Sequence, residues 1–202
     1  MATRTSRLGV DTNPYIAFSD LTLNLVFVLV FFVVAMLAVS QSGWEQVRYK
    51  QAQDRVAAAV RGANLPVTPT LLLPGQRNDP PGAQRWVFPS RRMFAGDTAT
   101  LTSDGQEILT NFARVLKSNL LWERIRIEGH TQTSREGVPE RWDLSAARAS
   151  AVAEVFYNGG RIPPYRLAVA ARGGQTPFAG KGFDPLNERV EIVVEYASKA
   201  AN

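Results

Sequence analysis

The sequence predicts an α+β fold in which a single membrane-spanning helix precedes one soluble domain. Residues 21–44 carry no charged side chain, and about 20 apolar residues in a helix span the core of a bilayer. From Arg85 onward, patterns typical of strands and of helices follow one another, as in a compact α+β domain. We expect four parts: a cytoplasmic tail at 1–14, a transmembrane helix at 15–40, a juxtamembrane helix and Pro-rich linker at 41–84, and the domain at 85–202.

Two polar side chains, Asp20 and Asn24, lie at the start of the apolar segment. In a helix they share one face, whereas Thr22 points elsewhere. An ionisable group within a membrane span is costly, and by default it indicates an ion or proton pathway. The alternative is that Asp20 is only an interfacial cap, because Asp is favoured at helix N-termini.

A cleaved signal peptide is the alternative for the whole N-terminal segment. Arg4 and Arg7 would supply its basic region, and residues 38–40 (Ala-Val-Ser) resemble a small-residue cleavage site. However, the apolar core is longer than that of a typical signal peptide, and two polar residues interrupt its start. We therefore expect an uncleaved membrane helix.

Residues 41–61 contain no proline and are rich in residues that favour helix. Their apolar side chains, Val47, Ala52, Val56 and Val60, form a stripe that we expect to be too thin for a core and suited to pairing with a second copy of the chain. Gly62 should end this helix. Residues 65–84 contain five prolines and two glycines, which predicts a linker or an irregular arm.

The elements of the domain follow from its periodic patterns. Ser103 and Gln106 form a capping box at the start of one helix, and Ser145 should cap a second helix that stops at Gly159 and Gly160. The alternating or apolar runs predict strands at 86–88, 124–128, 167–171 and 190–195. Right-handed crossovers would arrange them as a small mixed β-α-β-α-β-β sheet with both helices on one face.

Composition narrows the classes of function. The chain has no cysteine, which excludes disulfides, thiolate metal sites and cysteine nucleophiles. Its one histidine, His130, argues against a His-based metal site or a Ser-His-Asp triad, and we expect it to pack or hydrogen-bond locally. The net charge of +5 comes from scattered basic residues, so we expect no nucleic-acid partner; an anionic polymer or membrane surface fits as well. No catalytic constellation stands out, so we expect neither an enzyme nor a bound metal or cofactor.

Several ordered motifs resemble those of the OmpA-like peptidoglycan-binding domain. They are residues 127–131 (Ile-Glu-Gly-His-Thr), 142–149 (Trp-Asp-Leu-Ser-Ala-Ala-Arg-Ala) and 187–192 (Asn-Glu-Arg-Val-Glu-Ile). The resemblance covers about residues 85–196. The version at 142–149 is similar to the B-subunits of ion-driven motors, such as flagellar MotB and the Zorya subunit ZorB. A single span that opens with residues 18–21 (Phe-Ser-Asp-Leu) fits the same proteins.

The resemblance implies a site for peptidoglycan stem peptides. Arg148 would bind a stem-peptide carboxylate bidentately, with Thr131, Leu144 and Asn187 nearby; the alternative for Arg148 is a solvated arginine. The family usually has an Asp, which pairs with the ligand's ammonium, at the position of Gln132, and Asp143 is the candidate replacement. Losing that acid removes a bond worth roughly 1.5–3 kcal/mol, so we expect weaker binding or a different ligand. Arg141 and Glu188 also depart from the family pattern, replacing a common Asn and a common Arg.

The resemblance further implies an ion-conducting subunit of the bacterial inner membrane, with a cytoplasmic N-terminus and a periplasmic domain. Two copies would pass through a pentamer of a multi-span MotA-, ExbB- or ZorA-like partner, and Asp20 would carry H⁺ or Na⁺. The span lacks the Tyr-Ala-Asp and Thr-rich pattern common in flagellar stators, which favours another process such as anti-phage defence. The alternative is a passive membrane-to-peptidoglycan tether of the OmpA or Pal type.

Overall fold

The computed structural model describes residues 14–72, 79–80, 82–119, 122–132, 140–178 and 184–196. They belong to two units, 1–45 and 46–202. Of the expected cytoplasmic tail, residues 1–13 lie outside the described residues. The elements are α1 (Pro14–Gly62), β1 (Thr70–Leu72), β2 (Gln84–Pro89), α2 (Ser90–Met93), α3 (Ser103–Ser118), β3 (Trp122–His130), α4 (Trp142–Asn158), a 3-10 turn η1 (Pro164–Arg166), β4 (Leu167–Gly173) and β5 (Arg189–Tyr196).

The first unit contains the part of α1 that is long and apolar enough to cross a membrane, Tyr15–Ala38. Its large apolar side chains are exposed along the whole stretch. Exposure of so long an apolar surface to water is unfavourable, whereas its contact with lipid chains is favourable. This stretch lies within residues 15–40, and α1 ends at Gly62 as expected.

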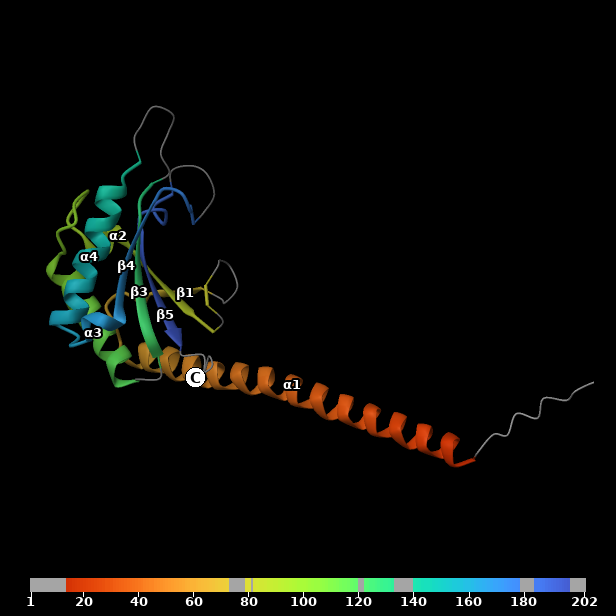
Figure 1. Cartoon of the computed structure of the whole chain (residues 1–202). Helices are drawn as coiled ribbons and strands as arrows, with labels where there is room; N and C mark the ends of the chain where they lie inside the picture. Colours follow the sequence, from red (N-terminus) through yellow and green to blue (C-terminus); the bar gives the residue numbers. More distant parts are fainter. Residues whose placement is uncertain are drawn as a thin grey trace, which may run out of the picture. The chain divides into compact units, whose positions relative to one another are not determined.

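The second unit is built on a five-stranded sheet in the order β1-β2-β5-β3-β4. β3 and β4 are parallel, and the other neighbouring strands are antiparallel. α3 and α4 cover one face of this sheet (Figure 1). The predicted α+β class, with a mixed sheet and both long helices on one face, is therefore confirmed.

The core lies between the sheet and these helices. Ile127 of β3 pairs with Ile192 of β5, and both are fully buried. The ring of Phe112 on α3 lies 5.1 Å from that of Phe88 and 6.3 Å from that of Phe156, measured between centroids. Alternation along each strand places one set of side chains in this core and the other set on the opposite face.

Both predicted helix caps were wrong. The N-cap of α3 is Thr102, whose side chain accepts a hydrogen bond from the backbone N of Gly105 at 3.0 Å. α4 begins at Trp142, a turn before the expected cap, Ser145. The Ser145 hydroxyl instead donates to the carbonyl of Trp142 at 2.9 Å and lies 3.3 Å from the backbone N of Gly173 in β4. Its role is to tie α4 to the sheet.

The apolar stripe expected to pair with a second copy of the chain lies in the core of the domain. Ala52, Val56 and Val60 are buried there, while the side chain of Val47 lies outside the described ones. Gln53 donates to the carbonyl of Gly82 at 2.7 Å, which ties the helix to the chain just before β2. The interpretation that the stripe is too thin for a core was wrong, because these side chains pack into the same core as those of the strands and the other helices. The buried stripe therefore gives no argument for a dimer.

Three further elements, β1, α2 and the 3-10 turn η1, lie where none was predicted. β1 pairs with β2 within the expected linker, and the short α2 follows β2 directly. The compact unit accordingly starts at Gln46, ahead of the expected start at Arg85.

Candidate functional site

The residues expected to bind peptidoglycan come from three segments that surround one end of the sheet. Thr131 and Gln132 follow β3, Leu144 and Arg148 lie on the first turns of α4, and Asn187 precedes β5. The end of β3 is paired with the start of β5, His130 opposite Arg189. The antiparallel pairing thus brings together residues that are far apart in the sequence.

The close approach of α4 to β3 depends on Gly129. A Cβ atom at this position would lie 1.9 Å from the carbonyl oxygen of Ser145. Only a residue without a side chain allows the first turn of α4 to lie directly on the strand. This contact positions Leu144 and Arg148 at the end of the sheet.

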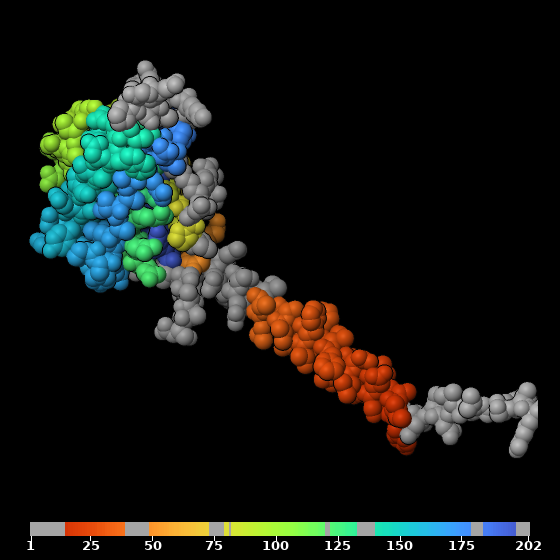
Figure 2. Space-filling model, turned by 45° about the horizontal axis from the view of Figure 1, so that its top comes forward, coloured from red at the N-terminus to blue at the C-terminus, as the bar shows by residue number. Residues whose placement is uncertain are grey.

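Arg148 is fully buried. Its Nε donates to the carbonyl of Thr98 at 2.9 Å, its Nη2 donates to that of Gly96 at 3.2 Å, and its guanidinium lies 5.3 Å from the ring centroid of Phe94. Figure 2 shows the yellow-green segment that contains these residues beside the teal turns of α4. Arg148 is therefore not the solvated arginine of the alternative, but a cation held rigidly in place.

Two acidic residues lie against the guanidinium of Arg148 at longer distances. Glu188 Oε2 is 3.4 Å from Nη1, and Asp97 Oδ1 is 3.6 Å from Nη2. The side chain of Glu188 is 30% exposed and that of Asp97 is 61% exposed. Asp97 also forms an ion pair with Arg141. Two departures from the family pattern, Arg141 and Glu188, thus belong to the Arg148 cluster, which we define as Asp97, Arg141, Arg148 and Glu188.

Gln132 and Asn187 both bind the segment around Asp184. Gln132 donates to the carbonyl of Asp184 at 2.7 Å, and the backbone N of Asn187 donates to the same carbonyl at 2.9 Å. The Asn187 side chain accepts from the backbone N of Phe178 at 2.7 Å. Asn187 is thus a positioning residue. Among the residues that the structure describes, the buried Oγ1 of Thr131 and Oε1 of Gln132 have no hydrogen-bond partner.

Asp143 is exposed on the first turn of α4, next to the buried Leu144. Within the described residues, no ion pair or hydrogen bond connects Asp143 to the Arg148 cluster. Sequence reasoning did not find Asp97. The sequence gives only an acidic residue after Gly96, and nothing local indicates that it lies beside Arg148, which is about 50 residues away in the sequence.

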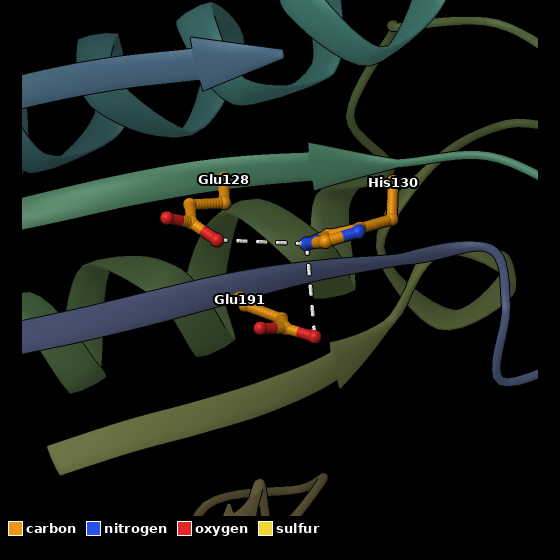
Figure 3. Close-up of side chains that lie close together, drawn as sticks. All are labelled: Glu128, His130 and Glu191. Atoms are coloured by element: carbon orange, nitrogen blue, oxygen red, sulfur yellow. Dashed lines mark ion pairs between the residues drawn. The ribbon is translucent and has the colours of Figure 1, made fainter. Parts of the chain in front are cut away.

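A second polar group lies on the face of the sheet opposite α3 and α4. Figure 3 shows Glu128, His130 and Glu191, whose ligand atoms lie within 4.8 Å of one another. His130 Nε2 is 3.8 Å from Glu128 Oε2 and 3.6 Å from Glu191 Oε1, and it has no hydrogen-bond partner within the described part of the chain. His130 Nδ1 lies 3.1 Å from the hydroxyl of Thr176. Two glutamates and a histidine are residue types that bind metal ions such as zinc, so the composition of this group resembles that of a metal site.

The surrounding charges argue against a metal ion. Arg85 forms ion pairs with both Glu128 and Glu191, Arg172 pairs with Glu128 at 2.9 Å, and Arg189 pairs with Glu191. Arg126 also pairs with Glu128 at 2.7 Å, and Asp79 pairs with both Arg85 and Arg126. Four guanidiniums beside three carboxylates leave a net positive charge, which repels a cation. This group is a buried ion-pair network that fixes β2, β3, β4 and β5 to one another.

The network sets the protonation of its members. Burial by itself would raise the pKa of Glu128, but its contacts with His130, Arg172 and Arg85 outweigh burial and hold the pKa well below its usual range. Burial lowers the pKa of His130, and the nearby Arg189 lowers it further. Glu128 is therefore ionised and His130 neutral at pH 7.

In the first unit, Asn24 Nδ2 donates to Asp20 Oδ1 at 3.4 Å. The Thr22 hydroxyl donates to the carbonyl of Phe18 at 2.7 Å instead. Asp20 and Asn24 therefore share one face, as their spacing predicts, and lie near the polar start of a span whose remaining residues, 25–38, are apolar.

Comparisons with known proteins match parts of this chain. Residues 93–190 match the OmpA family. An uncharacterized protein of Bacillus subtilis, YtxE, is 28% identical over 109 residues, which are 51% of this chain and 44% of that protein. The chain thus spans less than half the length of this relative.

Solved structures show the same fold. A MotB-like protein from Desulfovibrio vulgaris is similar with a TM-score of 0.62 and 21% identity, over 75% of this chain and 96% of that one. The periplasmic domain of Helicobacter pylori MotB gives 0.53 and 20%, over 64% and 89%. The cell wall anchor of the T6SS from Pseudomonas aeruginosa gives 0.53 and 21%, over 71% and 96%.

Proposed function

We propose that this protein is a membrane-anchored subunit that binds peptidoglycan, because residues 93–190 match the OmpA family and Tyr15–Ala38 is long and apolar enough to cross a membrane. The similar folds of a MotB periplasmic domain and of a cell wall anchor support this proposal. In this arrangement α1 holds the chain in the inner membrane, and the OmpA-family domain binds the wall from the periplasm.

The observation that carries the proposal is the buried guanidinium of Arg148. Two backbone carbonyls and the ring of Phe94 fix its position, while its contacts with Glu188 and Asp97 are long. A ligand carboxylate can replace these long contacts with shorter, charge-assisted hydrogen bonds. Peptidoglycan stem peptides end in such carboxylates.

Co-sedimentation of the full chain, in detergent, with purified sacculi tests this function. Arg148→Ala should weaken binding roughly ten- to a hundredfold, equivalent to roughly 1.5–3 kcal/mol. Because Arg148 is buried, Arg148→Lys serves as a second variant that keeps the charge but loses the bidentate geometry. Arg114→Ala, which changes an exposed arginine on α3, is the matched control. Undiminished pelleting of folded Arg148→Ala would place the site elsewhere.

We further propose that the subunit belongs to an ion-driven motor. Asp20, hydrogen-bonded to Asn24 on an apolar helix, would take up and release H⁺ or bind Na⁺. The partner would be a MotA-, ExbB- or ZorA-like multi-span protein, as a pentamer around two copies of this chain. The departures of the span from the flagellar pattern favour a process such as anti-phage defence over flagellar rotation.

Ion flux through the assembled complex tests the role of Asp20. Asp20→Asn keeps the size of the side chain and removes its charge, so flux and cellular function should be lost while membrane insertion persists. Thr22→Val, which removes a polar group from another face of the helix, should retain both. Normal flux in Asp20→Asn, with sacculus binding intact, would favour the alternative of a passive tether.

A further inference from the structure

The end of the sheet opposite the Arg148 cluster is the end at which α1 joins the domain. β3 starts there at Trp122, which pairs with Tyr196 near the end of β5. The Tyr196 hydroxyl donates to Gln84 Oε1, and Gln84 Nε2 donates to the carbonyl of Gln53 on α1 at 3.0 Å. Figure 1 shows the end of β5 beside the last turns of α1. We call this part of the domain the α1 end.

A cleft of about 360 Å³ lies at the α1 end. This volume falls within the range of small-ligand pockets, roughly 300–1,000 Å³. The side chains that line it come from the start of β3, from η1 and from the end of β5, and they are Glu123, Arg124, Tyr165, Arg166 and Glu195. The cleft therefore combines cations, acids and an aromatic ring.

Arg166 is a cation of the cleft that no described carboxylate neutralises. Its guanidinium lies 5.2 Å from the ring centroid of Trp122 and 6.0 Å from that of Tyr165. Its Nη1 donates to the carbonyl of Trp122 over a long 3.4 Å, and within the described part of the chain Arg166 forms no ion pair. Stacking on a ring leaves the N–H donors at the edge of a guanidinium available to an anion.

The two acids of the cleft do not cancel the charge of the arginines. Glu195 already pairs with Arg124 at 2.6 Å and with Arg126 at 3.0 Å, so its single charge is shared between two cations. Glu123 is exposed, and water and salt screen the field of an exposed carboxylate. With Arg166, three cations stand beside two acids, and the excess charge is positive.

The chain connects the α1 end to the apolar stretch of α1. That stretch ends at Ala38, and Tyr49 is already buried in the core of the domain, which leaves ten residues between them. Because an extended chain spans at most about 3.3–3.6 Å per residue, this tether is at most about 35 Å long. The α1 end is thus the part of the domain that follows the span most closely along the chain.

We propose that the cleft binds the phosphate headgroup of an anionic phospholipid, so that the domain docks on the surface of the membrane that holds the span. Arg166 donates to the phosphate oxygens, Arg124 supplies a second cation, and the exposed ring of Tyr165 lies among the headgroups, as tyrosines at membrane interfaces do. Phosphatidylglycerol fits, whereas a choline headgroup brings a cation that the arginines repel. This inference needs the membrane anchor of the proposed function, but not the binding of peptidoglycan.

Calorimetric titration of the full chain in detergent tests the cleft with water-soluble headgroups. We expect glycerophosphoglycerol to bind about tenfold or more tighter than glycerophosphocholine, and Arg166→Gln to weaken its binding by a similar factor. Glu123→Gln removes a repelling charge at an exposed position, so it should tighten binding without disturbing the fold. Arg114→Gln, at an exposed position on α3, is the matched control and should leave binding unchanged.

Nanodiscs that hold the full chain test the lipid itself. Because the chain has no native cysteine, Tyr165→Cys reports on the cleft, and Asp104→Cys, on the first turn of α3, reports on the other end of the domain. A water-soluble maleimide should label Tyr165→Cys more slowly when phosphatidylglycerol is added to phosphatidylcholine, and this difference should be lost in Tyr165→Cys with Arg166→Gln. The labelling rate of Asp104→Cys should not change.

The contrary outcomes are distinct. Equal binding of the two headgroups, or equal losses in Arg166→Gln and Arg114→Gln, would mean diffuse attraction and refute the site. If Arg166→Gln does not fold, unchanged binding in Glu123→Gln refutes it. If inorganic phosphate binds the cleft but phosphatidylglycerol does not slow labelling, the cleft takes free phosphate and the lipid claim is wrong. Arg166→Gln should still pellet with sacculi, so loss of pelleting in the unchanged chain would refute the proposed wall binding alone.

Discussion

Arg148 and His130 are both buried, and each lies beside two carboxylates, but the other groups around them differ. The guanidinium of Arg148 donates to two backbone carbonyls and lies 3.4 and 3.6 Å from the carboxylates of Glu188 and Asp97. His130 lies between two carboxylates that arginines already neutralise, so it remains uncharged. Neither environment can be read from the residue and its neighbours in the sequence, because the decisive partners lie on other strands and loops.

Gly129 makes a residue-scale prediction about stability. In Gly129→Ala, the new Cβ would lie 1.9 Å from a backbone carbonyl of α4, so the helix must shift away from β3. We expect a loss of about 1–3 kcal/mol or more in the free energy of unfolding, measured by urea denaturation. Gly62→Ala is the control, because its Cβ meets no atom within 4 Å. Equal stability of the two variants would refute the close packing of α4 on β3.

The lowered pKa of His130 predicts a pH dependence. A buried histidine whose pKa lies below 6.5 stabilises the folded state above that pH, and this stability is lost as the pH falls, because the unfolded chain binds the proton more readily. The free energy of unfolding should therefore decrease from about pH 7 to pH 5, and the decrease should be smaller in His130→Gln. Glu128, whose pKa is lowered, contributes a further loss only below about pH 4.3.

At the scale of elements, the regular core strands could be predicted from sequence. Apolar and polar residues alternate along β3, and along β5 except at Val193, because one face of each strand packs against helices. The starts of α3 and α4 were harder to locate. Arg141, the N-cap of α4, makes no side-chain capping hydrogen bond. Contacts of the first turn of α4 with β3 and β4 therefore set where this helix starts. β1 has three residues and exists by pairing with β2, and no local pattern encodes such a partner.

The last turns of α1 give an element-scale prediction. Val56 is fully buried in the domain, whereas Arg55 is exposed, and the chain has no native cysteine. A cysteine in the variant Val56→Cys should therefore react slowly with a water-soluble maleimide, and one in Arg55→Cys should react rapidly. Rapid labelling at both positions, or ready disulfide-linked dimers of Val56→Cys, would mean that this face is exposed and available to a second copy.

For the whole molecule, the division into an apolar span and an α+β domain was predictable from charge and periodicity. The Arg148 site was predictable only in part. The motif at 142–149 indicated Arg148. Its contacts with Asp97 and Glu188 could not be predicted, because these residues lie in segments that are far apart in the sequence. The contribution of residues 46–62 to the core was missed for the same reason: their partners are distant in sequence.

The central claim is that one chain is held by the membrane at one end and by the wall at the other. Single-particle tracking of the fluorescently tagged full chain in living cells tests it most directly. We expect the unchanged chain to be confined in intact cells and to diffuse once the wall is digested, and Arg148→Ala to diffuse even in intact cells. Free diffusion of the unchanged chain in intact cells, or equal confinement of a folded Arg148→Ala variant, would contradict the account.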